Sequence, residues 1–361
     1  YPEQTSARQA VIQRGQSLVD NIHRRYEGLS RIRGMLDQDV EATVGRINSI
    51  LTEVAGINEQ VVKIKAMGDN PNDLLDQRDR LVKELSGIVD ISVEGRDPDE
   101  FSIHTGGRHL LQGRVASYLS AEANPQNEGY TDVRWRGSEE EFSPQGGKLA
   151  ALLELRDGDL REEIQDLDMM TVNFIDMVNS IHRRGYGKNG NTGEDFFAQW
   201  PFVNNVEGNY DRDGDGEFDS TYLFRMTGTN SLDLQEQIGL EGTISLAGAQ
   251  QNVDIPYRST DTVEDLIKRI NTSGAEVVAR LDERGRLNLK AAPAADMNNP
   301  DFVIRHVEDS GHFLTGYSGI LTDSGAEGAY TWDQADGITA LRGEGVDYSV
   351  APLHHPAAWV E

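Results

Sequence analysis

Apolar side chains recur about every 3.5 residues along the first part of this chain. The pattern is carried by Leu18, Ile22, Leu29, Ile32, Leu36, Val40, Val44, Ile47, Leu51, Val54, Ile57, Val61 and Ile64. No proline lies between Pro2 and Pro71 to interrupt it. The spacing is that of a coiled-coil seam, so we predict one helix over residues 4–67, roughly 90 Å long. Glycines within this helix allow bends at one or two positions.

A second helix is predicted over residues 71–86, folded back on the first. Asn70 offers an N-cap side chain, Pro71 suits the first helical position, and Gly87 is typical of the residue that ends a helix. Two long helices packed in this way are more typical of a structural or assembly part than of an enzyme.

Shorter alternating segments predict a small β insert at about residues 88–142. The strand candidates are 88–93, 101–104, 110–111, 115–119 and 132–135, with residues 121–131 as a loop. A third helix is predicted from Ser143 to about Arg184, ended by Gly185. Three amphipathic helices of this kind can bury their apolar stripes only against each other, so we expect residues 1–190 to form a long-helix bundle domain with this insert.

The composition changes at about residue 191, where Gly, Asn, Asp and Thr become frequent and apolar runs shorten. The strand candidates are 221–226, 242–247, 251–256, 277–281, 287–290 and 302–306, and residues 263–270 are a predicted helix ended by Gly274. We therefore expect residues 191–361 to form a β-rich outer domain, with two subdomains as an option. The predicted fold class is mixed α and β, multidomain, with an elongated helical bundle domain followed by this outer domain.

The order of several motifs resembles the flagellar hook-associated protein 1 (FlgK) family. They are Leu-Leu-Asp-Gln-Arg-Asp-Arg-Leu at 74–81, Gly-Gly-Lys-Leu-Ala-Ala-Leu-Leu-Glu-Leu-Arg-Asp at 146–157, the stretch 174–182, and Gly-Asn-Thr-Gly at 190–193 before Phe196-Phe197. Residues at about 240–292 resemble a small flagellin-type ββα module. The resemblance covers about residues 1–290, and the order of the motifs is more specific than any one of them.

The resemblance implies a structural subunit of the bacterial flagellum that joins the hook to the filament, without catalysis. The implied partners are the hook protein, the second hook–filament junction protein, flagellin and an export chaperone. Self-association in a ring through terminal helices is also implied. The chain begins at Tyr1 in mid-pattern, so we expect a central fragment that lacks those helices. The implied location is a secreted, extracellular flagellum, or a periplasmic one if the flagellum is internal. A related junction protein or a flagellin-like filament subunit is an alternative within this class.

The acidic composition argues against nucleic-acid partners and against a purely electrostatic attachment to anionic lipid. The 361 residues carry a formal net charge of −27, whereas phosphate recognition needs a basic surface. The absence of cysteine excludes disulfides and thiolate metal sites. No apolar run approaches the ~20 residues of a membrane-spanning helix.

One acidic segment matches part of a calcium-binding loop. Carboxylates occupy alternate positions, a glycine follows at Gly216, and the candidate ligands are Asp211, Asp213, Asp215, Glu217 (through its backbone carbonyl) and Asp219. Tyr222 stands where such a loop ends in a bidentate glutamate, and Asp-Gly pairs also form hairpin turns. Calcium, with a bracing role, and a plain acidic turn therefore both stay open. A calcium-stabilised bacterial surface adhesin is the rival function from another class.

No other catalytic or metal-binding pattern emerges. His354-His355 and His182 are explained by solvation and by the dipole at a helix end, and no nucleophile motif or phosphate loop occurs. The charges Asp76, Arg78 and Asp79 have two interpretations, as solvated helix positions or as part of a subunit contact.

Overall fold

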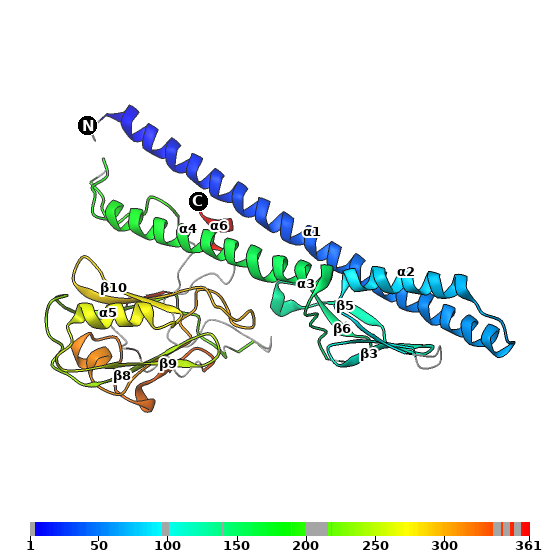
Figure 1. Ribbon diagram of the computed structural model, residues 1–361. Coiled ribbons are helices and arrows are strands. Elements are labelled where there is room, and N and C mark those ends of the chain that lie inside the picture. Colours follow the sequence, from blue (N-terminus) through cyan, green and yellow to red (C-terminus); the bar gives the residue numbers. More distant parts are fainter. Residues whose placement is uncertain are drawn as a thin grey trace. The chain divides into compact units, whose positions relative to one another are not determined.

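The predicted long helix is confirmed as α1 (Thr5–Ala66) in the computed structural model. It passes Gly15, Gly28, Gly34, Gly45 and Gly56 without a break (Figure 1). Its second half buries an apolar stripe that repeats every three or four residues, with Val40, Ile47, Leu51 and Val54 all at 0% exposure. Burial of this stripe outweighs the cost of about 1 kcal/mol that each glycine adds in a helix interior.

The structure describes residues 4–95, 101–138, 140–188, 190–198, 216–217, 219–334, 341, 347–349 and 355–361. Two compact units divide the chain. Unit 1 combines residues 1–23 with 167–361, and unit 2 consists of residues 24–166. Helices α1 and α4 (Leu160–His182) each contribute residues to both units. The boundaries between the two units therefore fall inside two helices. The division expected at residue 190 was based on the change in composition.

The second helix exists as α2 (Asn72–Ile88), but both of its predicted ends are wrong. Pro71, not Asn70, holds the N-cap position, and it makes no side-chain capping bond. Pro71 is itself buried and has a ψ of 63°, which keeps it out of the helix. Gly87 lies within the helix, because Leu85 and Val89 are both at 0% exposure and the Val89 N–H donates to the Leu85 carbonyl at 2.9 Å.

Unit 2 packs two small antiparallel sheets against its helices. The strands are β1 (Ser92–Glu94), β2 (Ser102–Thr105), β3 (Arg108–Gln112) and β4 (Val115–Ala116) in one sheet, and β5 (Leu119–Ala123) with β6 (Thr131–Trp135) in the other. Strand β5 extends into the segment expected to be a loop, which is reduced to a connection containing the short helix η1 (Pro125–Asn127). Figure 1 shows these strands together on one side of α2 and α3 (Gly147–Leu153). Side chains of α1, α2, α3 and both sheets share one core.

The predicted third helix is interrupted. Helix α3 is followed by a π-helical turn, η2 (Glu154–Asp159), and only then by α4. The π-helix has one more residue in its turn than an α-helix, and it carries Arg156, which is 1% exposed, into the interior of unit 2. The apolar face of α4 is also divided, because Met169 and Val172 pack against the β-rich core of unit 1. The expectation that three helices pack only against each other is therefore wrong.

The rest of unit 1 is the predicted β-rich part. One sheet has the order β10-β11-β7-β14 and another has the order β13-β12-β8-β9. The strands are β7 (Arg225–Ser231), β8 (Gly242–Ala247), β9 (Asn252–Tyr257), β10 (Val277–Leu281), β11 (Arg286–Ala291), β12 (His306–Asp309), β13 (Tyr330–Thr331) and β14 (Asp347–Ser349). The short helical elements of this part are η3 (Phe313–Tyr317), η4 (Ala326–Gly328) and α6 (Pro356–Trp359). One continuous core joins both sheets and α5 (Val263–Thr272).

Two strands in this part are displaced from their predicted positions. The prediction at 221–226 corresponds to β7, which starts at Arg225, and the prediction at 302–306 corresponds to β12, which starts at His306. The apolar residues that suggested strands are buried in irregular backbone instead. Leu223 is at 0% exposure, and Phe302 is 2% exposed with a positive φ of 59°. Burial alone does not distinguish a strand from a packed turn.

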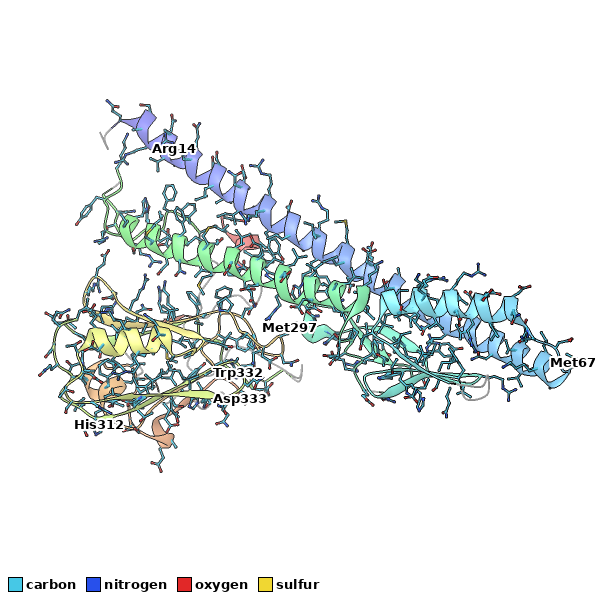
Figure 2. The ribbon with its side chains drawn as sticks, in the orientation of Figure 1. Arg14, Met67, Met297, His312, Trp332 and Asp333 are labelled. Carbon is cyan, nitrogen blue, oxygen red and sulfur yellow. The ribbon has the colours of Figure 1, made fainter. Side chains whose placement is uncertain are left out.

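The segment around α5 follows the prediction most closely. Strands β8 and β9 form a hairpin with Ile244 opposite Ile255, α5 follows, and β10 pairs with β11. Thr262 caps the helix in a capping box with Asp265, and Gly274 has a φ of +81° just after the helix. Figure 2 places His312, Trp332 and Asp333 in this β-rich part, and Met67 at the turn between α1 and α2.

Replacing Thr262 by alanine is expected to destabilise unit 1 by about 1 kcal/mol, because the N–H of Asp265 loses its side-chain acceptor. Thr272→Ala, near the other end of the same helix, is the matched control, since its hydroxyl bonds only to carbonyls of the preceding turn. Urea unfolding followed by circular dichroism measures both variants. Equal stabilities would contradict the capping role.

Candidate functional site

An open groove runs along the helical part of unit 1. It lies between the first turns of α1 and the end of α4 with the loop that follows, and its volume is about 1450 Å³. Val11, Ile12 and Gly15 line it from α1, Ile181 from α4, and Phe196 from the loop. The groove thus brings together two segments that lie more than 160 residues apart in the sequence.

Large apolar side chains remain exposed along this groove. Val11 is 56% exposed, Ile12 50%, Ile181 59% and Tyr186 75%. Four such side chains lining one hollow form a contiguous patch, whereas scattered exposed apolar residues need no explanation. A patch of this kind is typical of a surface that binds another protein segment.

Aromatic rings form the floor of the groove. Phe196 and Phe197 pack edge to face with ring centroids 4.9 Å apart, and Phe197 contacts Phe174 of α4 at 5.8 Å. Gly15 permits the approach of α1, because a Cβ atom there would lie 2.8 Å from Cε1 of Phe196. The glycine is therefore a close-contact position rather than a bend.

Asn179 holds this floor in place from within α4. Its side chain is fully buried, its Oδ1 accepts from the N–H groups of Phe196 and Phe197 at 2.9 Å each, and its Nδ2 donates to the carbonyl of Phe197 at 2.9 Å. Three bonds from one amide fix the loop on the helix. At the rim, Arg183 forms a two-point ion pair with Asp195, with Nε–Oδ1 at 2.5 Å and Nη2–Oδ2 at 3.0 Å.

A charge cluster connects α4 to the β-rich part of unit 1. The carboxylate of Asp176 pairs with Arg225 (2.9 Å), Arg280 (2.6 Å) and the amine of Lys290. Asp176 and Lys290 are almost fully buried, whereas Arg280 is half exposed. Burial would raise the pKa of Asp176, but Lys290 and the two arginines outweigh it and lower that pKa. The cluster places three cations around one carboxylate.

Lys290 gives unit 1 a testable pH dependence. Burial, with the nearby Arg280 and Arg225, lowers its pKa from 10.5 to about 8 despite the opposing effect of Asp176. Between those values the unfolded chain binds the proton and the folded chain does not, so stability rises with pH. Relative to Lys290→Met, the wild type should gain up to about 3 kcal/mol between pH 8 and 10.5. Urea unfolding measures the free energy of unfolding of both proteins across this pH range. A difference between them that stays constant or falls as the pH rises contradicts the lowered pKa of Lys290.

The segment at residues 355–361 docks on the same helix. Asp168, which is 1% exposed, accepts from the Ala357 N–H at 2.7 Å and faces Nδ1 of His355 at 3.0 Å. Burial raises the pKa of Asp168, and the bonds from His355 and Ala357 oppose that rise. His355 therefore has a structural contact, while His354 lies outside the described residues.

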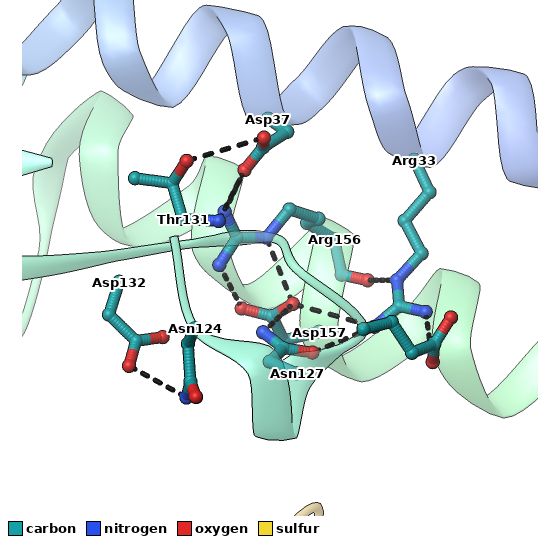
Figure 3. A network of polar contacts seen from close by, with 9 residues as sticks. Arg33, Asp37, Asn124, Asn127, Thr131, Asp132, Arg156 and Asp157 are labelled. Atoms are coloured by element: carbon teal, nitrogen blue, oxygen red, sulfur yellow. Dashed lines mark hydrogen bonds and ion pairs between the residues drawn. The ribbon is translucent and has the colours of Figure 1, made fainter. Parts of the chain in front are cut away.

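Unit 2 contains a second buried polar network, in which two arginines are each 1% exposed (Figure 3). Arg156 bonds Asp157 through Nε (2.9 Å) and Nη2 (2.5 Å), and its Nη1 reaches Asp37 of α1 at 2.6 Å. Arg33 donates to the carbonyl of Arg156 at 3.1 Å and to Asn127 at 3.0 Å.

The network also holds the connection between β5 and β6. Asp37 accepts from the Thr131 N–H at 2.9 Å, Arg33 pairs with Glu128 at 2.8 Å, and its guanidinium lies 4.3 Å from the ring centre of Tyr130. Glu128 has a positive φ of 53°, a conformation that non-glycine residues adopt at a cost. The network thus ties α1, the π-turn and this connection to one another.

A match to a protein-family model identifies the family of this chain. The model of the flagellar hook-associated protein FlgK helical domain matches residues 1–197, more than half of the chain. The chain belongs to the FlgK family. The model of the flagellin hook IN motif matches residues 243–292, which contain β8, β9, α5, β10 and β11.

Curated FlgK relatives agree with this assignment. Flagellar hook-associated protein 1 of Escherichia coli is 32% identical over 205 residues, which cover 54% of this chain and 38% of that protein. The Bacillus subtilis protein of the same name is 29% identical over 228 residues, covering 53% of this chain and 43% of that protein. The matches thus span about two fifths of the length of these relatives.

A solved FlgK structure shares the fold. The flagellar hook junction protein FlgK from Burkholderia pseudomallei superposes with a TM-score of 0.54 at 17% identity, over 99% of this chain and 54% of that one. The predicted mixed fold, helical in its N-terminal part and β-rich in its C-terminal part, is confirmed. No helix among the described residues of this FlgK family member is long and apolar enough to cross a membrane.

The predicted calcium ligands lie largely outside the described residues. Asp211, Asp213 and Asp215 are not described, while Glu217 is exposed and Asp219 half-buried beside the gap. Among the residues that are described, no group of three or more His, Asp or Glu side chains is arranged to hold a metal ion. The calcium site stays a prediction.

The charges in the Leu-Leu-Asp-Gln-Arg-Asp motif have separate roles in the structure. Arg78 is directed inward, with its guanidinium 4.0 Å from the ring centre of Phe101 and Nη1 3.3 Å from Oδ1 of Asn58. Asp79 has a side chain 73% exposed, and its Oδ1 lies 3.8 Å from Nε of Arg78. Arg78 is therefore a packing residue, and of these charges only exposed ones such as Asp79 remain open to a partner.

Proposed function

We propose that this chain is part of a structural, non-catalytic subunit of the bacterial flagellum that joins the hook to the filament. The observation that carries the proposal is the FlgK helical-domain match over residues 1–197. The apolar groove in unit 1 supports the proposal, because a subunit that assembles with others needs exposed apolar surface to which their helical segments can bind. The proposed partners are the hook protein, the second junction protein, flagellin and an export chaperone, at a secreted, extracellular or periplasmic flagellum.

In this proposal the groove receives helical segments of the assembled junction, including those of neighbouring subunits. The relatives are more than twice as long as the matched region, so they have further chain to supply such segments. Residues at about 240–292 form the flagellin-type module of the outer part, in agreement with the hook IN motif match. This module would project from the junction without taking part in its axial contacts.

Co-sedimentation with purified hook polymer tests the proposal. The full-length protein should pellet with hooks saturably and cap one end in electron micrographs. Ile181→Asp, at a groove position 59% exposed, should lose this binding, while Leu234→Asp, 42% exposed in the β-rich part, should keep it. A full-length protein that stays monomeric and unbound beside competent hooks would reject the junction role.

We also propose that the loop 211–219 binds calcium through Asp211, Asp213, Asp215 and Asp219 with the carbonyl of Glu217. The supporting observation is the alternate spacing of carboxylates before Gly216, whose φ of +94° suits a sharp turn. Calorimetric titration with CaCl₂ should show one site that Asp213→Asn weakens. If CaCl₂ gives the same titration heat with the wild type and with Asp213→Asn, the segment is a plain acidic turn and not a calcium site.

A further inference from the structure

Two histidines of unit 2 lie directly opposite each other on neighbouring strands. His104 of β2 is the cross-strand partner of His109 of β3, and their ring centroids are 4.2 Å apart. They are the sole histidines in residues 24–166, out of eight in the chain. Directly opposed positions place both side chains on the same face of the sheet.

Neither ring is needed for the core of unit 2. His109 is exposed, and its ring contacts the ring of His104. His104 has a side chain 19% exposed and also lies outside the apolar core. Two imidazoles in this position are free to act as ligands without unpacking the fold.

The surroundings of His104 orient its ring as a metal ligand requires. Its Nε2 lies 2.9 Å from the hydroxyl of Ser102 and 3.9 Å from the carboxylate of Glu94. The Glu94 carboxylate attracts a hydrogen on Nε2, and the Ser102 hydroxyl can accept the hydrogen bond from it, so in this tautomer the Nδ1 lone pair is available to a metal ion. Metal-binding histidines are typically oriented by such a bond from the second ring nitrogen.

We propose that His104 and His109 form a two-imidazole clamp for a late first-row divalent cation such as Zn²⁺, with water completing the coordination. Two nitrogens bound tetrahedrally at about 2.0–2.1 Å lie ~3.3 Å apart. Rings with centroids 4.2 Å apart reach that separation when the exposed side chain of His109 rotates toward His104. Imidazole suits Zn²⁺, Cu²⁺ and Ni²⁺, and the carboxylate of Glu94 supplies a compensating negative charge.

The described residues offer no third protein ligand in place, consistent with the finding that no group of three or more candidate ligands is arranged around one point. The clamp is therefore an exchangeable surface site. It differs from the proposed calcium loop in position and in ligand chemistry, since that loop offers only oxygen.

Isothermal titration of the tag-free 361-residue chain with ZnCl₂ tests the clamp, with excess CaCl₂ present to occupy the acidic loop. The wild type should bind one Zn²⁺ at this site, and His109→Ala should weaken that binding at least tenfold. Because the ring of His109 is exposed, this variant should retain the fold. His182→Gln, which removes an exposed imidazole in unit 1, is the matched control and should bind as the wild type does.

A footprint of the imidazoles locates the ion independently. Diethyl pyrocarbonate should modify His104 and His109 in the free protein, and saturating Zn²⁺ should protect both. Equal Zn²⁺ affinity of the wild type and His109→Ala, or labelling of the two rings unchanged by Zn²⁺, would overturn the proposal.

Discussion

An Arg156→Met variant is expected to lose ~3–5 kcal/mol of unfolding free energy, because it leaves charges in unit 2 without their partner. Arg156 is 1% exposed and bonds Asp37 and Asp157, which are themselves only 18% and 17% exposed. Methionine fills similar space but neutralises neither carboxylate. Urea unfolding followed by circular dichroism measures the loss.

The control for this variant is Arg25→Met. Arg25 also pairs with a carboxylate, Glu163, but the two side chains are 63% and 45% exposed. Surface pairs of this kind contribute ~0–1 kcal/mol. Arg156→Lys should recover little, because an ammonium cannot reproduce the two parallel bonds that the guanidinium donates to Asp157 while also reaching Asp37. Similar losses for the Arg25 and Arg156 variants would show that burial of the network does not matter.

An Asp176→Asn variant is expected to lose a similar ~3–5 kcal/mol, in unit 1. The substitution keeps the shape of the side chain but removes the carboxylate that Lys290, Arg225 and Arg280 share. Three cations then face a neutral amide, with Lys290 only 5% exposed. Adding Lys290→Met should recover part of the stability, since the buried excess charge falls by one.

Glu283→Gln is the matched control for Asp176→Asn. Glu283 pairs with Arg184 of the same unit, but the side chains of this pair are 55% and 58% exposed. Its loss should be small. The same urea series compares Asp176→Asn with the double variant, and a double variant less stable than Asp176→Asn alone would contradict the account of excess positive charge.

The elements that could be predicted from the sequence are those defined by local signals. The long helix α1 follows from its regular apolar spacing, and α5 follows from the Thr and Asp residues at 260–262 before it and from Gly274 after it. The hairpin β8–β9 follows from alternation. In each case the sequence near the element determines its backbone, so one sequence is enough.

The ends of α2 and the break after α3 could not be predicted in the same way. Pro71 and Gly87 have strong local preferences, but burial of Pro71 and of the neighbours of Gly87 overrides them. The π-turn is stabilised by contacts of Arg156 with residues distant in the sequence, such as Asp37. From the neighbouring sequence alone, such an arginine is expected to be a solvated charge on the surface.

The candidate site was the part least accessible to sequence analysis. The floor of the groove depends on Asn179, whose three bonds join residues 17 and 18 positions away. Asp176 is one of 61 acidic residues, and nothing in its neighbourhood along the chain marks it as buried. The motifs identified the family, whereas the groove and the charge clusters required the tertiary structure.

The discontinuity of unit 1 has a consequence for the order in which the chain can fold. Unit 2 is a single stretch, residues 24–166, so a chain that emerges with its N-terminus first has every residue of this unit once Asp166 is free. The first turns of α1 must wait for partners that begin at Leu167, and Asp168 must wait for residues 355–361. During emergence the apolar residues Val11 and Ile12 therefore remain without their native neighbours until Ile181 and Phe196 have followed.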